Sequence, residues 1–347
     1  MKNLLRLLLK SQHQRNRVQK SQKEHGMTLI ELLIGTVMAF LIITPMLGFV
    51  VDMLNTDRRE QIKANTEQDI QAAVDFIAQD LSQAIYIYDN AGITAINSSL
   101  TPLPTVPNGT PILVFWKRQL REKALPRAPI GPNNPRPSAC DRNARPGTAN
   151  ECNDTYVLSL VAYYQIKDRD ATWCQPSGGT GDKCPTRIAR HNIRDGLKDP
   201  RAANSASPYY PGEEPSLAYN PLFDINKPVE SVTRAGNDWA SKEVLVNYID
   251  PSDLNVPPLP NCQIELGVPN PAPPASAINA ADLLIANPDK TNSFYACVDT
   301  SRNLARVTIR GNSQRRLQPN NADYNASKSA FFPTATVQVQ GRGARGE

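Results

Sequence analysis

One acidic residue, Glu31, stands at the start of a long uncharged stretch and is the first candidate for chemistry. Residues 32–51 contain no Asp, Glu, Lys or Arg. About 20 apolar residues in a helix are enough to cross the hydrocarbon core of a membrane. A carboxylate at such a position costs a few kcal/mol and usually marks a function. The alternative is a Glu31 side chain that extends to the water at the membrane interface.

The basic residues gather before this stretch. Residues 1–26 carry seven Lys and Arg and one acid, Glu24, out of 38 basic and 33 acidic residues in the chain, so 31 basic and 32 acidic residues remain. A basic flank favours a cytoplasmic location for residues 1–26. The near-neutral remainder argues against a nucleic-acid partner. A core helix that is apolar all round is the alternative to a span, but nothing else in the chain is apolar enough to surround it.

The junction before the span carries a recognisable pattern, HGMTLIELLIG. It resembles the class III signal of type IV pilins and pseudopilins, in which a prepilin peptidase cuts after the glycine and methylates the new N-terminus. The resemblance implies a cut between Gly26 and Met27, and methylation of Met27. It also implies that Glu31 of one subunit meets the Met27 amine of a neighbouring subunit during filament assembly. No A-x-A-like cleavage site follows the apolar run, as a secretory signal peptide would require.

The helical pattern continues beyond the span. Apolar residues recur at spacings of three and four, which predicts an amphipathic helix with one buried stripe: Ile70, Val74, Ile77, Leu81 and Ile85. The sequence therefore predicts one helix from Met27 to about Tyr88, with a kink or local melting at Pro45 and Gly48. "FIAQDLSQA" resembles the end of this helix in larger minor pilins and J-type pseudopilins.

The rest of the chain is predicted to be a β-rich head. Runs rich in Val, Ile, Tyr and Phe, separated by long Pro-, Asn- and Gly-rich loops, predict strands at residues 111–116, 156–166, 187–193, 243–249, 294–299, 304–309 and 335–340. Antiparallel sheet against the second half of the helix would bury both apolar faces. The predicted class is α+β with a pilin-like fold. Its segments are a cytoplasmic leader (1–26), a membrane or filament-core helix (27–51), an amphipathic continuation (52–91) and a periplasmic or extracellular head (92–347).

Six cysteines all follow the span, which suits disulfides formed in an oxidising compartment. Six cysteines allow fifteen pairings, and the sequence does not choose among them. We expect nearest-neighbour pairs: Cys140–Cys152, Cys174–Cys184 and Cys262–Cys297. A metal site is the alternative, but the chain has no C-x-x-C pair, and His191 is the only histidine after the span, so zinc is disfavoured.

No catalytic constellation emerges. A Ser–His–Asp or Cys–His arrangement after the span would depend on His191. His191 lies in the strand-like RIARHNI, where a structural role is expected. The sequence thus predicts a non-enzymatic protein without a cofactor or metal.

Further runs refine the resemblance. "ILVFWKR", "SLVAYY", "FYACVD" and "ARVTIRGN", with the long helix, resemble the minor pseudopilins of hormogonium polysaccharide secretion in filamentous cyanobacteria. This implies a single-pass inner-membrane protein, or a subunit of a cell-surface filament, that serves polysaccharide secretion and gliding motility. Implied partners are the prepilin peptidase, other pilins, an inner-membrane assembly platform and a polysaccharide. The alternatives are an adhesive or filament-priming minor pilin (J/W-type) and a membrane-tethered periplasmic enzyme.

Overall fold

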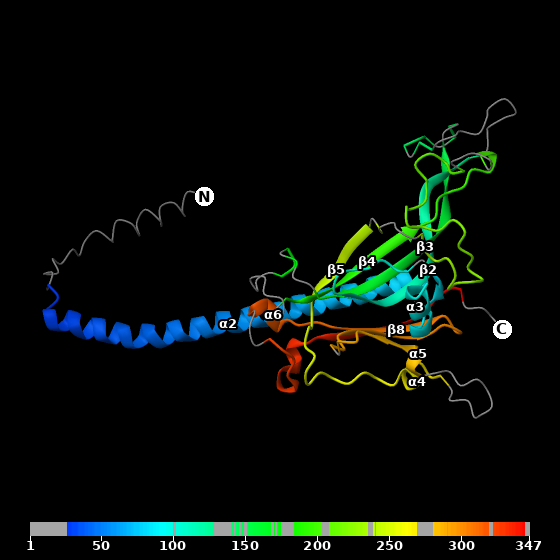
Figure 1. The fold of residues 1–347 in the computed structure, drawn as a ribbon. Coiled ribbons are helices and arrows are strands. Elements are labelled where there is room, and N and C mark those ends of the chain that lie inside the picture. The colour runs from blue at the N-terminus through cyan, green and yellow to red at the C-terminus, as the bar shows by residue number, and fades with distance from the viewer. Residues whose placement is uncertain are drawn as a thin grey trace, which may run out of the picture. The chain divides into compact units, whose positions relative to one another are not determined.

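The computed structural model describes residues 26–99, 102–127, 140–141, 143–145, 147–148, 151–167, 170, 172–174, 184–202, 208–234, 239, 241–268, 280–289, 291–318 and 322–343. The predicted leader therefore lies outside the described residues, apart from Gly26. The chain divides into two units, Met1–Arg58 and Arg59–Glu347. Helix α2 (Leu29–Ser82) contributes to both units (Figure 1).

Helix α2 begins at a threonine cap. The Thr28 carbonyl accepts hydrogen bonds from the backbone N–H groups of Glu31 and Leu32 at 3.0 and 3.1 Å. The Thr28 hydroxyl accepts a longer bond from Glu31 N at 3.4 Å. The Leu32 bond is the first regular bond of the helix, and the bonds from Glu31 N satisfy an N–H group that a helix start otherwise leaves free. The helix then runs unbroken through Pro45 and Gly48, so local melting at these residues is not present in this structure, and the kink stays a prediction.

The helix ends at Ser82, six residues before the predicted end near Tyr88. Strand β1 (Ala84–Ile87) follows it. The sequence pattern failed here because Ile85 continues the three-and-four spacing of the helix. In the fold, β1 instead pairs with β2, with Tyr86 opposite Trp116 and Ile87 opposite Phe115. Pairing of aromatic and β-branched residues stabilises a strand and here outweighs the helical pattern.

A five-stranded antiparallel sheet follows the order β1-β2-β3-β4-β5. Its other strands are β2 (Gly109–Pro126), β3 (Cys152–Ile166), β4 (Thr186–Arg194) and β5 (Ser241–Ile249). The sequence predicted all four of these strands, although β2 runs ten residues further than its predicted end at residue 116. Across this sheet Val114 lies opposite Ala162, and Ala162 lies opposite His191.

A four-stranded antiparallel sheet follows the order β6-β7-β8-β9. It contains β6 (Leu284–Ala286), β7 (Phe294–Asp299), β8 (Leu304–Arg310) and β9 (Thr334–Gln340). The sequence predicted β7, β8 and β9. It missed β6, which has only three residues, too few to show a period. The protein is therefore α+β, with a long apolar N-terminal helix and antiparallel sheets.

Short helices occupy the connections. These are α3 (Asn90–Asn97), α4 (Cys262–Glu265), α5 (Ala280–Leu283), α6 (Gln314–Leu317) and two 3₁₀ segments, Pro200–Ala202 and Ala326–Phe331. Asp89 caps the start of helix α3, and its carboxylate accepts a hydrogen bond from the Gly92 N–H at 2.7 Å. The helix turns the chain directly after β1.

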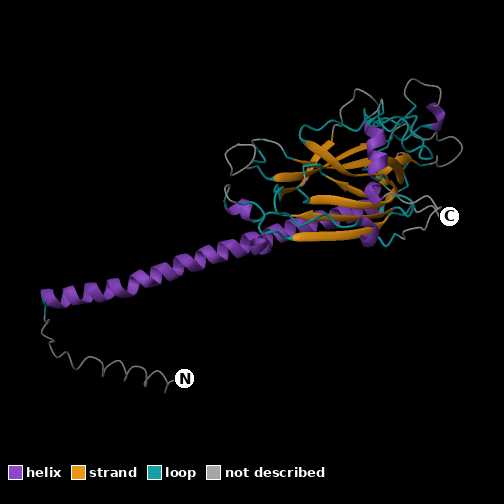
Figure 2. Cartoon of the chain, turned by 60° about the horizontal axis from the view of Figure 1, so that its bottom comes forward, coloured by secondary structure: helices purple, strands orange, loops and turns teal. Residues whose placement is uncertain are grey.

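The second half of α2 forms the centre of the core. Its buried residues are Thr66, Ile70, Ala73, Val74, Ile77, Asp80 and Leu81. The apolar members belong to one cluster with residues of both sheets, including Phe115, Tyr163, Phe294 and Val307. In both views this part of α2 passes between the two sheets (Figures 1 and 2). The predicted buried stripe is confirmed for Ile70, Val74, Ile77 and Leu81.

Candidate assembly site at the start of helix α2

The residues before α2 are exposed and not helical. Gly26, Met27 and Thr28 precede the first helical turn, and Met27 is 77% exposed. A Cβ placed on Gly26 would meet no atom within 4 Å. The backbone of Gly26 does not adopt the left-handed conformation that favours glycine. Packing and backbone shape therefore give no reason for glycine at this position within the described part of the chain.

Glu31 lies in the first turn of α2. The positive end of the helix dipole favours a carboxylate there. Within the part of the chain that the structure describes, no hydrogen bond or ion pair involves the Glu31 carboxylate, and the residue is exposed. The structure thus places Glu31 four residues after Met27, with its carboxylate available to a group from another molecule.

The apolar residues around Glu31 are also exposed. Every large apolar side chain between Met27 and Leu54 is between 48 and 89% exposed. Polar side chains in this region bond to their own helix: Thr36 Oγ1 donates to Leu33 O at 2.9 Å, and Thr44 Oγ1 donates to Phe40 O at 2.8 Å. A helix that satisfies its own polar groups is what a hydrocarbon environment requires. By length and composition, α2 can span a membrane, which is consistent with a single-pass anchor.

The far end of α2 carries a second acid, Asp80, which is buried among charged partners. Lys117 Nζ donates to Asp80 Oδ1 at 2.6 Å, and Arg190 Nε donates to Oδ2 at 2.8 Å. The Tyr163 hydroxyl donates to Oδ2 at 2.7 Å. These partners lie on β2, β4 and β3. One carboxylate therefore joins the helix to three strands of the five-stranded sheet.

Electrostatics keep the Asp80 carboxylate ionised. Burial alone would raise the pKa of Asp80, but Arg190 and Lys117 outweigh it and lower the pKa below its usual value. Burial lowers the pKa of Arg190, but the nearby Asp80 carboxylate raises it, and the pKa of Arg190 is raised overall. Burial, and then Asp80, raises the pKa of Tyr163 well above its usual value. The cluster is thus an anionic carboxylate held by two cations and a neutral phenol.

The sequence reading missed the Asp80 cluster, although a signal was present. Asp80 follows Ile77 by three residues and precedes Leu81, so it falls on the predicted buried stripe. A charged residue on a buried helix face needs a partner. That rule would have identified Asp80, but its partners lie 37, 83 and 110 residues away in the chain and could not be read from local spacing.

The middle of α2 meets the segment after β8 at a glycine. A Cβ placed on Gly311 would lie 2.9 Å from Ile70 Cγ1 and 3.1 Å from Thr66 Cγ2. Nearby, Arg316 forms an ion pair with Asp69, and Lys63 Nζ lies 4.5 Å from the centre of the Phe331 ring. Gly311 therefore permits a close approach between α2 and the four-stranded sheet.

The structure contains the three predicted disulfides, Cys140–Cys152, Cys174–Cys184 and Cys262–Cys297. Cys152 begins β3, and Cys174 and Cys184 both lie in the connection between β3 and β4. The third pair joins α4 to β7 and belongs to one buried cluster with Leu266 and Leu283. Each bond closes a loop of the head and so restricts the unfolded chain.

His191 lies inside β4 and is 4% exposed. Its ring centre is 5.0 Å from that of Tyr164 and 6.4 Å from that of Trp239. This is a packed aromatic environment, in line with the expected structural role. Among the described residues, no group of three or more His, Cys, Asp and Glu could hold a metal ion.

No family model, curated protein or solved structure matches the chain.

Proposed function

We propose that the protein is a minor pseudopilin, a non-enzymatic subunit of an assembly related to type IV pili and type II secretion systems. The observation that carries the proposal is the state of Glu31. Its carboxylate has no partner among the described residues, lies in the first turn of an exposed apolar helix, and follows Gly26–Met27 by a few residues. A subunit that packs this helix against neighbouring copies would cover the apolar side chains and provide the missing partner.

Gly26 and Met27 supply the cut site in this proposal. The peptide bond lies in exposed, non-helical chain, so a peptidase can reach it without unfolding α2. The fold does not require glycine at position 26, which leaves recognition by the peptidase as its reason. The cut removes the basic leader and keeps the apolar helix. It also creates a positive α-amine on Met27, which is then methylated.

Glu31 pairs with the Met27 amine of a neighbouring subunit. Opposite charges attract more strongly in an apolar filament core than in water. A pair of this kind fixes the axial position of one helix against the next. The head stays attached through the second half of α2, which the two sheets bury.

The biological setting rests on the sequence resemblance. The pseudopilin would sit in the inner membrane with its N-terminus cytoplasmic and its head periplasmic, and would join other pilins and the assembly platform. It would serve polysaccharide secretion and gliding motility. Deletion of the gene, followed by separate assays of piliation and of secreted polysaccharide, distinguishes this role from that of an adhesive or filament-priming pilin.

The direct test is N-terminal analysis of the mature chain by mass spectrometry. We expect a chain that starts at Met27 and carries a methyl group on its amine. Gly26→Ala should leave an unprocessed band of higher mass. Gly35→Ala is the matched control, since Gly35 is also exposed with open space around it, and should be processed normally. A wild-type chain that keeps its leader would overturn the proposal.

A further inference from the structure

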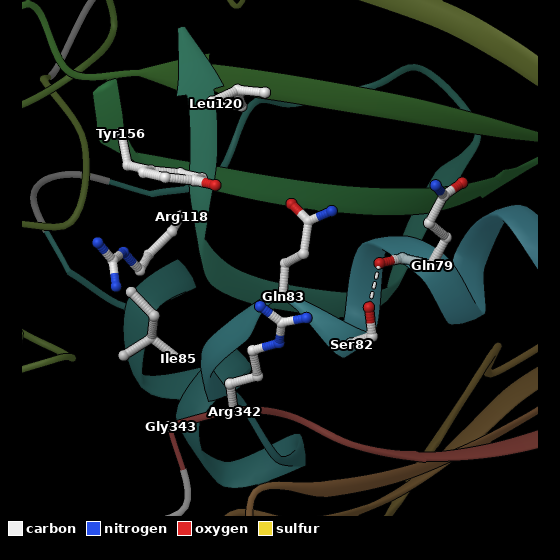
Figure 3. Close-up of a pocket in the computed structure, with 9 residues that line it drawn as sticks. All are labelled: Gln79, Ser82, Gln83, Ile85, Arg118, Leu120, Tyr156, Arg342 and Gly343. Atoms are coloured by element: carbon white, nitrogen blue, oxygen red, sulfur yellow. Dashed lines mark hydrogen bonds between the residues drawn. The ribbon is translucent and has the colours of Figure 1, made fainter. Parts of the chain in front are cut away.

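A pocket of about 710 Å³ opens where α2 ends and β1 begins. Its lining includes Gln79 from the end of α2, Gln83 from the turn before β1, Arg118 and Tyr156 from β2 and β3, and Arg342 from the segment after β9. Figure 3 shows these side chains arranged around one opening. The volume is within the range of about 300–1,000 Å³ that is usual for ligand sites.

Two glycines bring Arg342 into this pocket. Gly343 N donates to Ala84 O at 3.2 Å, and Gly341 N donates to Asn303 O at 2.9 Å. A Cβ on Gly343 would lie 2.1 Å from Ile85 O, and one on Gly341 would lie 2.6 Å from Ala84 O. Only residues without a side chain can approach the backbone of β1 so closely. The Gly-Arg-Gly sequence therefore fixes Arg342 beside the end of α2.

The sheet supplies the opposite wall. Leu120 lies directly opposite Tyr156 in the β2–β3 pair, and Arg118 is two residues from Leu120 on the same face. The Arg118 guanidinium lies 5.0 Å from the centre of the Tyr156 ring. Tyr156 is 55% exposed and Leu120 is 42% exposed. An exposed aromatic ring beside a guanidinium thus forms one side of the pocket.

The charge of the pocket is positive. Both charged side chains in its described lining are arginines, and no acidic side chain lines it. The helix end contributes partial negative charge, but donors cover some of the carbonyls at this end of α2. Ser82 Oγ donates to Gln79 O at 2.7 Å, the dashed bond in Figure 3, and Arg118 N donates to Gln83 O at 3.4 Å. Two guanidinium groups therefore remain to attract an anion.

The combination of groups matches an acidic sugar. Arginine forks bind carboxylates and sulfates through paired hydrogen bonds. The amides of Gln79 and Gln83 offer both donors and acceptors to hydroxyl groups. The Tyr156 ring offers a flat apolar surface to the C–H face of a sugar ring. A purely apolar ligand would desolvate both arginines without a counter-charge, which is costly.

We propose that this pocket binds a short segment of an acidic polysaccharide, with Arg118 and Arg342 on its acid groups and Tyr156 under a sugar ring. The inference rests on the proposed function in one respect, that the head faces the compartment through which the polysaccharide passes. A nucleic acid is a weaker candidate, because such ligands are held by many phosphate contacts, whereas the pocket offers two arginines.

The test is isothermal titration of the full-length chain in lipid nanodiscs at low and at 0.15 M salt. The probes are oligogalacturonate, a sulfated oligosaccharide and a neutral cello-oligosaccharide of equal length. We expect both acidic probes to bind, the neutral probe to bind at least tenfold more weakly, and salt to weaken the acidic probes. Comparison of the two acidic probes shows whether carboxylate or sulfate is preferred, and either preference supports the proposal.

Four variants locate the binding. Arg118→Gln and Arg342→Gln should each raise the Kd roughly tenfold, because each loses a charge-assisted contact. Tyr156→Ala should raise it severalfold. Arg234→Gln removes the same charge from an exposed position outside the pocket lining and should change the Kd less than twofold. Thermal unfolding of each variant confirms that the head is folded.

The proposal is overturned if the neutral probe binds as tightly as the acidic ones, or if Arg234→Gln weakens binding as much as the pocket variants. It is also overturned if a poly-glutamate peptide or a single-stranded oligonucleotide binds more tightly with the same dependence on Arg118 and Arg342. Titration in nanodiscs does not require processing. A chain cut at Met27 that binds no sugar refutes only this inference, and an uncut chain that binds sugar refutes only the proposed function.

Discussion

The two halves of α2 share one helix and have opposite environments. In the first half, large apolar side chains are exposed and Glu31 has no partner among the described residues. In the second half, the apolar stripe is buried and Asp80 contacts two cations and a phenol. Asp80 and the apolar stripe of the second half have partners within the described chain, whereas the large apolar side chains of the first half are exposed. The difference separates the part of the helix that is buried in the head from the exposed part that assembles with other subunits in the proposed function.

Asp80→Ala gives the largest expected effect. Its removal leaves Lys117 and Arg190 buried without their shared counter-charge. We expect the free energy of unfolding of the head to fall by about 3–5 kcal/mol, measured by urea unfolding of the full-length protein in detergent. Asp69→Ala is the control on the same helix. Asp69 is about half exposed and pairs with Arg316, so its loss should cost less than about 1 kcal/mol. If the two variants lowered the free energy of unfolding equally, the contrast between the buried Asp80 and the half-exposed Asp69 would be wrong.

In contrast to Asp80→Ala, Glu31→Ala should leave the stability of the head unchanged and should reduce assembly. The urea unfolding curve of the head should not change, because the Glu31 carboxylate makes no contact in the described structure. Processing at Gly26–Met27 should also continue. Incorporation into filaments or pilin complexes should fall by roughly tenfold or more, since a charged hydrogen-bonded contact contributes about 1.5–3 kcal/mol.

Incorporation of the Glu31 variants is measured by quantitative immunoblotting, which compares the amount of protein in sheared filament fractions with the amount in whole cells. Glu31→Gln extends it, because the glutamine keeps the size of the side chain and loses its charge. Incorporation of Glu31→Ala at the wild-type level would show that the acid is not part of assembly, and would leave α2 as an anchor alone.

Glycine-to-alanine substitutions test how tightly the chain is packed around each half of α2. Gly311→Ala places a methyl group 2.9 Å from Ile70 Cγ1, and we expect it to destabilise the head by about 1–3 kcal/mol through overpacking. Gly35→Ala adds a methyl group to an exposed helical position with open space around it. That change should leave stability unchanged or raise it by up to about 1 kcal/mol. Both values come from thermal unfolding, and a destabilising Gly35→Ala with a neutral Gly311→Ala would contradict the assignment of buried and exposed faces.

The sequence was informative wherever the signal was local. Seven strands follow from runs rich in Val, Ile, Tyr and Phe, and the buried stripe from Ile70 to Leu81 follows from helical spacing. The three disulfides are the nearest-neighbour pairs that we expected among the fifteen possible pairings. Features that depend on residues far apart in the chain were not predicted from the sequence. Strand β1 depends on its pairing with β2, and the pocket depends on Gly341 and Gly343 meeting β1 from the other end of the chain. No local sequence pattern predicts these contacts, because the conformation of each segment depends on the distant segment that it contacts.

The pH dependence of the difference in stability between wild type and Asp80→Asn reports on the charge of Asp80. The pKa of Asp80 is lowered in the fold, since Arg190 and Lys117 outweigh the effect of burial. Its contribution is therefore complete above the unfolded pKa of about 3.9 and is lost as the pH falls through the lower folded pKa. Between wild type and Asp80→Asn, the gap in unfolding free energy should be constant from pH 7 to about 5. Below about pH 4 it should narrow by up to about 1.4 kcal/mol per pH unit.

Urea midpoints from pH 7 to 2.5 measure this gap. Because Asp250 and Asp195 have raised pKa values and are present in both proteins, they cancel in the comparison. A gap that stays constant down to pH 2.5 would show that the Asp80 partners hold it by shape and hydrogen bonds rather than by charge.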